Sequence, residues 1–120
     1  MATKHRLQFQ GNNVSVDSSS WTTDKPVVDG LIKGDVVLLI FDYTHYSDNK
    51  VARNLEGFTV DGKLLWIAEN PVDTANEAYA EFIEEENNQS GNTVEVGDLA
   101  GFRCTVDINT GQLVNVVFTK

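Results

Sequence analysis

The stretch from Asn54 to Ala68, NLEGFTVDGKLLWIA, decides the fold of this chain. Apolar and polar residues alternate on both sides of Asp61-Gly62. An Asp-Gly pair between two alternating runs is the strongest short signal for a β-hairpin. The pattern therefore predicts a strand over 54–60, a tight turn, and a return strand over 63–68.

The rest of the chain also has the pattern of short strands separated by turns. Val36 to Tyr43 is apolar on both faces and rich in β-branched and aromatic residues, which predicts the central strand. Asp17 to Lys25 is predicted to be a polar loop around Trp21. Further strands are predicted over 6–10, 14–16, 26–32, 99–107 and 112–119. We expect one all-β domain over residues 1–120. It should be an antiparallel meander of about eight to ten strands, arranged as a curved sheet or as two packed sheets.

Two of the predicted hairpins resemble each other. Leu55-Glu56-Gly57-Phe58 matches Leu99-Ala100-Gly101-Phe102, 44 residues later. A repeat of about 40 to 45 residues with four strands per unit is typical of propeller blades. A closed propeller needs at least about four blades. The sequence therefore predicts blade-like hairpins in a smaller sheet and not a closed propeller.

The segment from Pro71 to Asn88 allows two interpretations. Thr74-Ala75-Asn76-Glu77 fits a helix capping box, and the apolar residues that follow fall on one helical face. This local pattern favours a short helix near 74–85. The alternation from Tyr79 to Glu84 also fits a strand.

The turn motifs carry a resemblance to known proteins. Asp61-Gly62 followed by Lys63-Leu64-Leu65-Trp66 resembles the strand-turn-strand piece of quinoprotein-type propeller blades. From Pro26 to Lys120, the chain resembles a group of small, stand-alone, uncharacterised bacterial all-β proteins. The shared features are the strand Arg53-Asn54-Leu55, the Asp-Gly-Lys-x-x-Trp return strand and the Asp-x-x-Thr-Gly turn at Asp107. The resemblance implies a mostly antiparallel meander in which Tyr79 to Glu84 is a strand. It implies no activity.

The charge is concentrated in one part of the chain. The 39 residues from Leu64 to Phe102 hold 9 carboxylates and no Lys or Arg, and acids and bases cancel in the other 81. The whole net charge of -9 therefore comes from this stretch. Binding to a nucleic-acid backbone needs clustered Lys and Arg, so the sequence excludes it, and anionic membranes are excluded for the same reason. A partner attracted by this field would be basic.

The strongest hypothesis for function is protein binding through this acidic region. Tyr79 and Phe82 beside the acids resemble the mixture of aromatic anchors and charge found at interfaces. We expect a non-enzymatic binding module, such as an inhibitor or immunity-type protein for a basic partner. A solvated acidic face and a structural or homo-oligomerising β domain without a dedicated ligand are the alternatives. The predicted partner-binding residues are Tyr79, Glu81, Phe82, Glu84, Glu85, Glu86, Glu95 and Asp98.

No catalytic or metal-binding motif stands out. His5, His45 and Cys104 are too few for a zinc site of the Cys₂His₂ type, so we expect hydrogen-bonded histidines and a buried inert thiol. We predict no enzymatic activity, no metal and no cofactor. A single cysteine, an N-terminus without an apolar run, and a longest apolar run of only Val36 to Phe41 predict a cytoplasmic protein that does not enter membranes.

Overall fold

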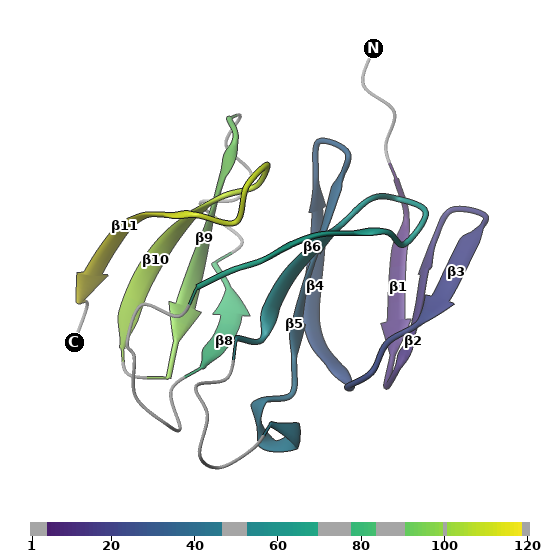
Figure 1. Ribbon diagram of the computed structural model, residues 1–120, viewed down its shortest axis with the longest axis horizontal. Helices are drawn as coiled ribbons and strands as arrows, with labels where there is room; N and C mark the ends of the chain where they lie inside the picture. Colours follow the sequence, from purple (N-terminus) through teal and green to yellow (C-terminus); the bar gives the residue numbers. More distant parts are fainter. Residues whose placement is uncertain (1–4, 47–52, 70–77, 84–90, 100, 119–120) are drawn as a thin grey trace.

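A computed structural model describes residues 5–46, 53–69, 78–83, 91–99 and 101–118. These residues form eleven β-strands in three antiparallel sheets (Figure 1). A single 3₁₀ turn, η1 (Tyr43–His45), interrupts them within the described ranges. The strands are β1 (Leu7–Gln10), β2 (Asn13–Val16), β3 (Ser19–Thr22), β4 (Val27–Lys33), β5 (Val36–Phe41), β6 (Leu55–Phe58), β7 (Leu64–Ile67), β8 (Tyr79–Phe82), β9 (Thr93–Asp98), β10 (Phe102–Asp107) and β11 (Leu113–Phe118).

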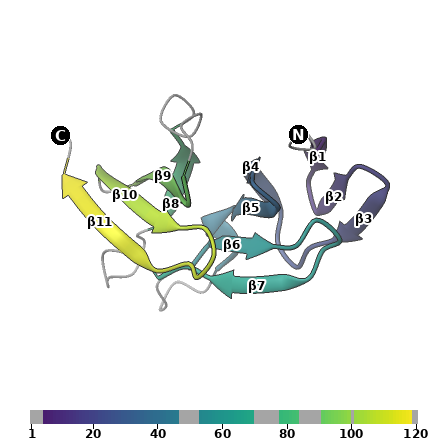
Figure 2. The same ribbon diagram turned by 90° about the horizontal axis from the view of Figure 1, so that it is seen from above.

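The three sheets follow one another along the chain. Sheet A has the order β1-β2-β3, sheet B the order β4-β5-β6-β7, and sheet C the order β8-β9-β10-β11. Sheet B lies between the other two (Figure 2). The first strand of each sheet contacts that of the next, β1 with β4 and β4 with β8. The predicted all-β antiparallel fold is confirmed, with three sheets where one or two were expected and eleven strands where about eight to ten were expected.

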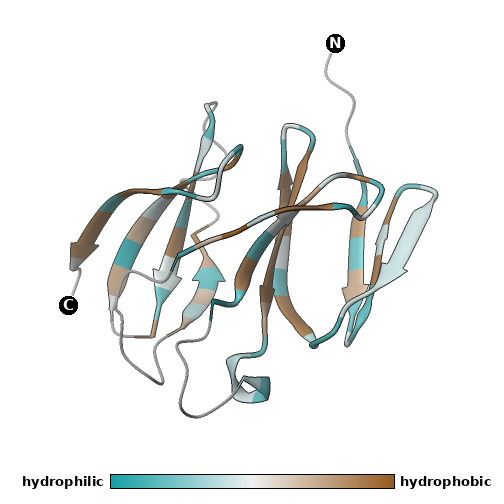
Figure 3. Ribbon diagram, in the orientation of Figure 1, coloured by the Kyte–Doolittle hydropathy of each residue, from teal (hydrophilic) through white to brown (hydrophobic). Residues whose placement is uncertain are grey.

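Sheet B lies at the centre of the stack because apolar side chains on both of its faces pack into the two hydrophobic cores. Figure 3 shows the hydrophobic colour along β5. All six residues of β5 are buried, which confirms Val36 to Phe41 as a central strand. Leu38 and Ile40 point toward sheet C, whereas Leu39 and Phe41 point toward sheet A. The alternation of the predicted strands puts eight residues in the core, and Val60 and Phe102 are only partly buried at its edge. The six that are buried are Val36, Leu38, Ile40, Phe58, Trp66 and Val106.

The repeat found in the sequence has a structural counterpart. Leu55–Phe58 and Phe102–Asp107 are the third strands of sheets B and C, and each is followed by a glycine turn and the fourth strand. The two four-stranded sheets therefore share one order of strands, although the matched motif fills β6 in sheet B and reaches only the first residue of β10 in sheet C.

Trp66 of β7 joins sheet B to sheet C by a hydrogen bond and by close packing. The Trp66 indole Nε1 donates a hydrogen bond of 2.8 Å to the Ile108 carbonyl. The ring lies between two glycines, since an added Cβ would come within 2.4 Å of it at Gly57 and within 2.6 Å at Gly111. Gly111 also has a φ of 77°, a conformation that glycine adopts without strain. Sheet packing at this point therefore depends on two positions without a side chain.

Sheets A and B meet in a similar way through Trp21. An added Cβ at Gly62, in the turn after β6, would lie 2.7 Å from the Trp21 ring. Ser19–Thr22 is strand β3, which corrects the prediction of a polar loop over Asp17 to Lys25. These four residues become a strand because they pair with β2 and because Trp21 packs on the core between the sheets.

Strand β8 settles the ambiguous segment where the structure describes it. Tyr79–Phe82 is a strand, which confirms over these four residues the strand that the resemblance implied and excludes there the helix that the local pattern favoured. Residues 74–77 and 84–85 lie outside the described part of the chain. A β-bulge between Tyr79 and Glu81 breaks the alternation, so Tyr79 and Phe82 enter the same core and do not lie on opposite faces as simple alternation predicts.

Candidate functional site

The predicted acidic site falls mainly on sheet C. Glu81 of β8 is exposed. Glu95 of β9 is partly buried, and its carboxylate accepts bonds of 3.0 Å from Arg103 Nε and 2.6 Å from Thr105 Oγ1. These contacts fix Glu95 within the sheet. Glu84, Glu85 and Glu86 lie outside the described residues.

The burial of Tyr79, Phe82 and Asp98 disagrees with a role as exposed partner-binding residues. Tyr79 and Phe82 are 1% and 4% exposed. The Tyr79 hydroxyl donates to the Glu69 carbonyl, and burial raises the pKa of this phenol. Asp98 is also buried, and its Oδ1 accepts a 2.9 Å bond from the Phe102 backbone N–H. These three residues are therefore not part of the exposed surface of sheet C.

Strand β8 is held in place by polar side chains of sheet B. Asn54 is fully buried and bridges β5 and β8 by donating to the carbonyls of Phe41 at 2.8 Å and Tyr79 at 2.9 Å. Asp29 Oδ2 accepts the Phe82 backbone N–H at 2.9 Å. These bonds complete the pairing of a strand that lies at the edge of its sheet, so Asn54 and Asp29 have structural roles.

A second candidate site lies between sheets A and B. It is a pocket of about 230 Å³ with aromatic walls. The ring centroids of Trp21 and Phe58 are 6.0 Å apart, and those of Phe41 and Phe58 are 6.4 Å apart in an edge-on arrangement. Its aromatic and charged lining includes Trp21, Asp24, Lys25, Tyr46, Glu56 and Phe58.

Of the three charged side chains in this pocket, Lys25 and Asp24 form an ion pair, whereas Glu56 forms none with the described residues. Lys25 Nζ lies 2.9 Å from Asp24 Oδ2 and 4.6 Å from the centroid of the Tyr46 ring. Glu56 has no hydrogen bond or ion pair to any described residue. Burial raises the pKa of the Glu56 carboxyl, which the positive charge of Lys25 partly offsets. The pKa of the Tyr46 phenol is raised by burial and by the negative charges of Glu56 and Asp24.

Sequence reasoning missed this pocket. Its residues come from β3, β5 and β6, from the segments after β3 and η1, and from the turn after β6. Only the packing of sheet A on sheet B brings them together. One signal was available in the sequence. Glu56 stands between Leu55 and Gly57-Phe58 in a predicted strand, and an acidic residue among apolar neighbours needs either solvent or a partner.

A larger hollow of about 980 Å³ opens on the face of sheet A that is turned away from sheet B. Amide and hydroxyl side chains line much of it. It offers no charged or titratable side chain, so it has less chemistry for recognition than the aromatic pocket. The polar residues in question are Gln8, Gln10, Asn13, Ser15, Ser20 and Thr22.

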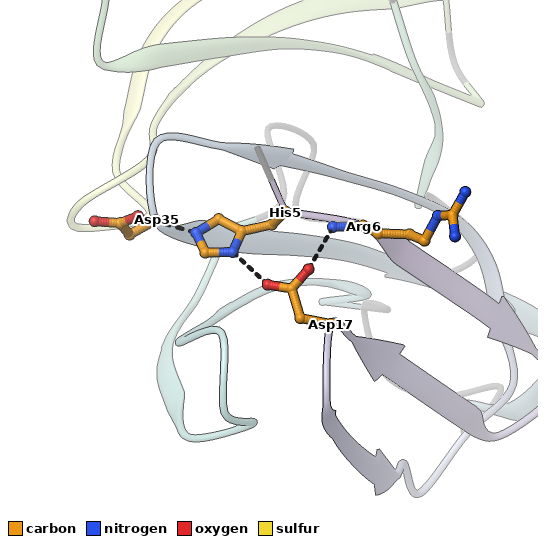
Figure 4. Close-up of polar contacts among 4 residues, drawn as sticks. All are labelled: His5, Arg6, Asp17 and Asp35. Carbon is orange, nitrogen blue, oxygen red and sulfur yellow. Dashed lines mark hydrogen bonds and ion pairs between the residues drawn. The ribbon is translucent and has the colours of Figure 1, made fainter. Parts of the chain in front are cut away.

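His5 forms hydrogen bonds with two aspartates (Figure 4). His5 Nδ1 lies 2.7 Å from Asp17 Oδ2, and its Nε2 lies 3.3 Å from Asp35 Oδ1. Asp17 Oδ1 also accepts the Arg6 backbone N–H at 2.9 Å. The bond to Asp17, followed by that to Asp35, raises the pKa of His5, and the His5 bond lowers the pKa of Asp17. The histidine thus joins the start of β1 to two turns, as expected for a hydrogen-bonded residue.

The remaining candidates for a reactive or metal-binding site are Cys104 and clusters of His, Cys, Asp and Glu side chains. Cys104 is buried in the core between sheets B and C, and burial raises the pKa of its thiol to about 12, as expected for an inert cysteine. In the described ranges, no three His, Cys, Asp or Glu side chains gather as a metal site would require. None of the described helices is long and apolar enough to span a membrane.

Three antiparallel sheets that follow one another along the chain form an all-β domain, and its structural neighbours include a β-propeller protein. The chain belongs to the family described as Domain of unknown function (DUF7957), whose model matches residues 4–118. No curated protein matches this chain in sequence.

Two solved structures are similar in fold. One is BamB from Moraxella catarrhalis, a β-propeller protein, with a TM-score of 0.61 and 18% identity over 94% of this chain and 32% of BamB. The other is the computationally designed Ika4 protein, with a TM-score of 0.63 and 15% identity over 100% of this chain and 70% of Ika4. The chain thus spans about a third of the length of BamB. Identities this low establish the fold and nothing about activity.

Proposed function

We propose that this domain is a non-enzymatic binding module for a basic protein, of the inhibitor or immunity type. The supporting observation is the separation of charge. Three acidic residues of the stretch from Leu64 to Phe102, namely Glu81, Glu95 and Asp98, belong to β8 and β9 of sheet C, which lies at one end of the stack (Figure 2). A negative field confined to one end of a domain orients a positive partner before contact and speeds association.

The test uses the acidic residues outside the described part of the chain. Replacing Glu84, Glu85 and Glu86 with Gln removes three charges from the stretch. Partners captured from native lysate by the wild type are purified, and their on-rates are measured against salt. Screening shortens from about 10 Å at 0.1 M salt to about 3 Å at 1 M, so the wild-type on-rate should fall steeply over this range. The triple variant should associate more slowly at low salt and converge with the wild type at high salt.

A control variant distinguishes this field from net charge alone. Asp35→Asn combined with Asp61→Asn removes exposed charge from turns in sheet B, outside the acidic stretch. It should slow association less per charge removed than the triple variant does. Salt-independent on-rates, equal in all three proteins, would leave the acidic stretch as a solvated face.

A structural or oligomerising domain is the second candidate. The outermost strands of sheets B and C are edges with exposed apolar side chains, such as Ile67 at 49% and Val114 at 60% exposure. Exposed edges of this kind can pair between copies. The molecular mass measured by sedimentation over a wide range of protein concentration tests this candidate. A dimer that dissociates in the Val116→Lys variant of β11 would favour it.

A further inference from the structure

The pocket between sheets A and B has the size of a side chain. Its volume of about 230 Å³ lies below the range of about 300–1,000 Å³ that holds drug-sized ligands and cofactors. A single amino-acid side chain or a small organic molecule fits such a space. The walls are aromatic, so one part of the ligand must be apolar or cationic.

The aromatic walls and the charge of the pocket favour a cation. The faces of Trp and Tyr attract ammonium and guanidinium groups within about 6 Å of the ring centroid. Lys25 Nζ already occupies such a position over Tyr46, at 4.6 Å. Lys25 forms its ion pair with Asp24, whose side chain is 93% exposed. This ion pair therefore lies at the solvent-facing side of the pocket.

Two polar groups that line the pocket lack a hydrogen-bond partner among the described residues, the Trp21 indole Nε1 and the Glu56 carboxylate, and the carboxylate is the charged one. It is partly buried beside the aromatic rings and has no hydrogen bond or ion pair to the described residues. With Asp24 and Lys25, the pocket carries a formal charge of -1 when all three groups are ionised. A second positive group would therefore neutralise the pocket, and a buried carboxylate is stabilised when it is paired.

We propose that this pocket binds an alkylammonium or guanidinium group, with Glu56 as its counter-ion and the rings of Trp21, Tyr46 and Phe58 as its walls. Lys25 acts as a competing internal cation that the ligand displaces from Tyr46. The source of the group is a Lys or Arg side chain of the basic partner, and this part of the inference rests on the proposed function. A free organic amine has the same chemistry and is the other possible source.

The surroundings of Glu56 suit a long basic side chain. Glu56 pairs directly with Ile67 across β6 and β7, and Ile67 and Leu65 are about half exposed on this outer strand. Sheet A ends at its third strand, whereas sheet B has four. An apolar strip thus lies beside the carboxylate, where the methylene stem of Lys or Arg can pack while the charged end enters the pocket.

The first experiment measures binding of n-butylammonium by NMR, following the indole N–H signal of Trp21 at constant ionic strength. n-Butylguanidinium is the second probe, and n-butanol is the neutral control. Both cations should bind at least tenfold more tightly than n-butanol. Equal affinity for the alcohol and the cations would overturn the proposal, because the pocket would then select only for apolar shape.

Variants of the pocket test the assigned roles. Glu56→Gln should weaken n-butylammonium binding at least tenfold, whereas Glu81→Gln, the same change on exposed sheet C, should leave it unchanged. Tyr46→Leu should weaken binding, and Tyr46→Phe should retain most of it. Lys25→Gln should tighten binding several-fold, an outcome that damage to the fold would not produce. Weaker binding in Lys25→Gln would contradict the role of Lys25 as a competitor.

The source of the cation is tested on the partner complex. If the partner inserts a basic side chain, Glu56→Gln should raise the off-rate at least tenfold and leave the on-rate nearly unchanged, whereas the Glu84, Glu85 and Glu86 variant acts on the on-rate. An unchanged off-rate together with tight n-butylammonium binding would overturn the partner as the source and assign the pocket to a free amine. Absence of any salt-dependent partner would overturn the proposed function without affecting the binding of n-butylammonium.

Discussion

Gly57→Ala should destabilise the domain through a single ring. An added Cβ would lie 2.4, 2.5 and 2.9 Å from three atoms of the Trp66 indole. The ring cannot move away freely because its Nε1 donates to Ile108 and because Gly111 closes its other side. Gly57 does not have a positive φ, so alanine fits the backbone and the clash is the only cause of the expected loss.

The size of the effect follows from three contributions. Forcing a methyl group into a packed site costs about 1–3 kcal/mol. Displacing the indole loses a buried hydrogen bond that contributes about 1 kcal/mol. Replacing a strand glycine with alanine recovers roughly 0.5–1 kcal/mol of backbone entropy. The free energy of unfolding should therefore fall by about 2 kcal/mol.

Gly97→Ala is the matched control. Gly97 lies in a strand without a positive φ, and the nearest atom to an added Cβ is 3.9 Å away, at the Glu81 carbonyl. This variant should be stabilised by roughly 0.5 kcal/mol. Urea unfolding at 25 °C measures both, and the two midpoints should differ by about 1–2 M at the slopes usual for small domains. Midpoints that agree within about 0.3 M would refute the idea that Trp66 is fixed between two glycines.

Three further outcomes are expected. Leu38→Ala should lower the free energy of unfolding by about 2–5 kcal/mol in urea unfolding, because this fully buried side chain lies in the core between sheets B and C; a loss under about 1 kcal/mol would argue against that core position. The pKa of His5, measured by NMR titration, should lie above its usual 6.5. The stabilisation of the fold by protonated His5 is then complete below pH 6.5 and is lost as the pH rises through the pKa of the folded state. A pKa at or below 6.5 would contradict the bonds to Asp17 and Asp35. Cys104 should not react with a thiol reagent at pH 8 in the folded protein, since its pKa is about 12, and rapid labelling under native conditions would show that the core opens there.

The parts of the fold that the sequence predicted well are those set by local chemistry. Asp61-Gly62 and Gly111 are turn residues, and each is followed by the expected return strand. Val36–Phe41 is apolar on both faces because sheets lie on both sides of it, so its composition alone indicates a central strand. Such signals need no knowledge of the rest of the chain.

The parts that were missed depend on partners distant in sequence. Ser19–Thr22 has a polar composition and becomes a strand through pairing with β2 and through the packing of Trp21. Thr93–Asp98 was not predicted either, although Val94 and Val96 alternate with outward residues. The bulge that turns both Tyr79 and Phe82 into the core is equally invisible to a rule of alternation. The aromatic pocket was missed for the same reason, since it exists only where two sheets meet.

The chemistry of the sheet faces explains why the sheets stack in this way within the described residues. Both faces of sheet B are apolar and are covered by sheets A and C. The opposite face of sheet A carries amides and hydroxyls, and that of sheet C carries the bonded Glu95, Arg103 and Thr105. Packing another sheet on either face would remove these polar groups from water, which costs free energy unless new hydrogen bonds replace the contacts with water. Burial therefore favours the two observed sheet–sheet contacts, and the two surfaces that we propose for recognition are the acidic residues of sheet C and the pocket at the junction of sheets A and B.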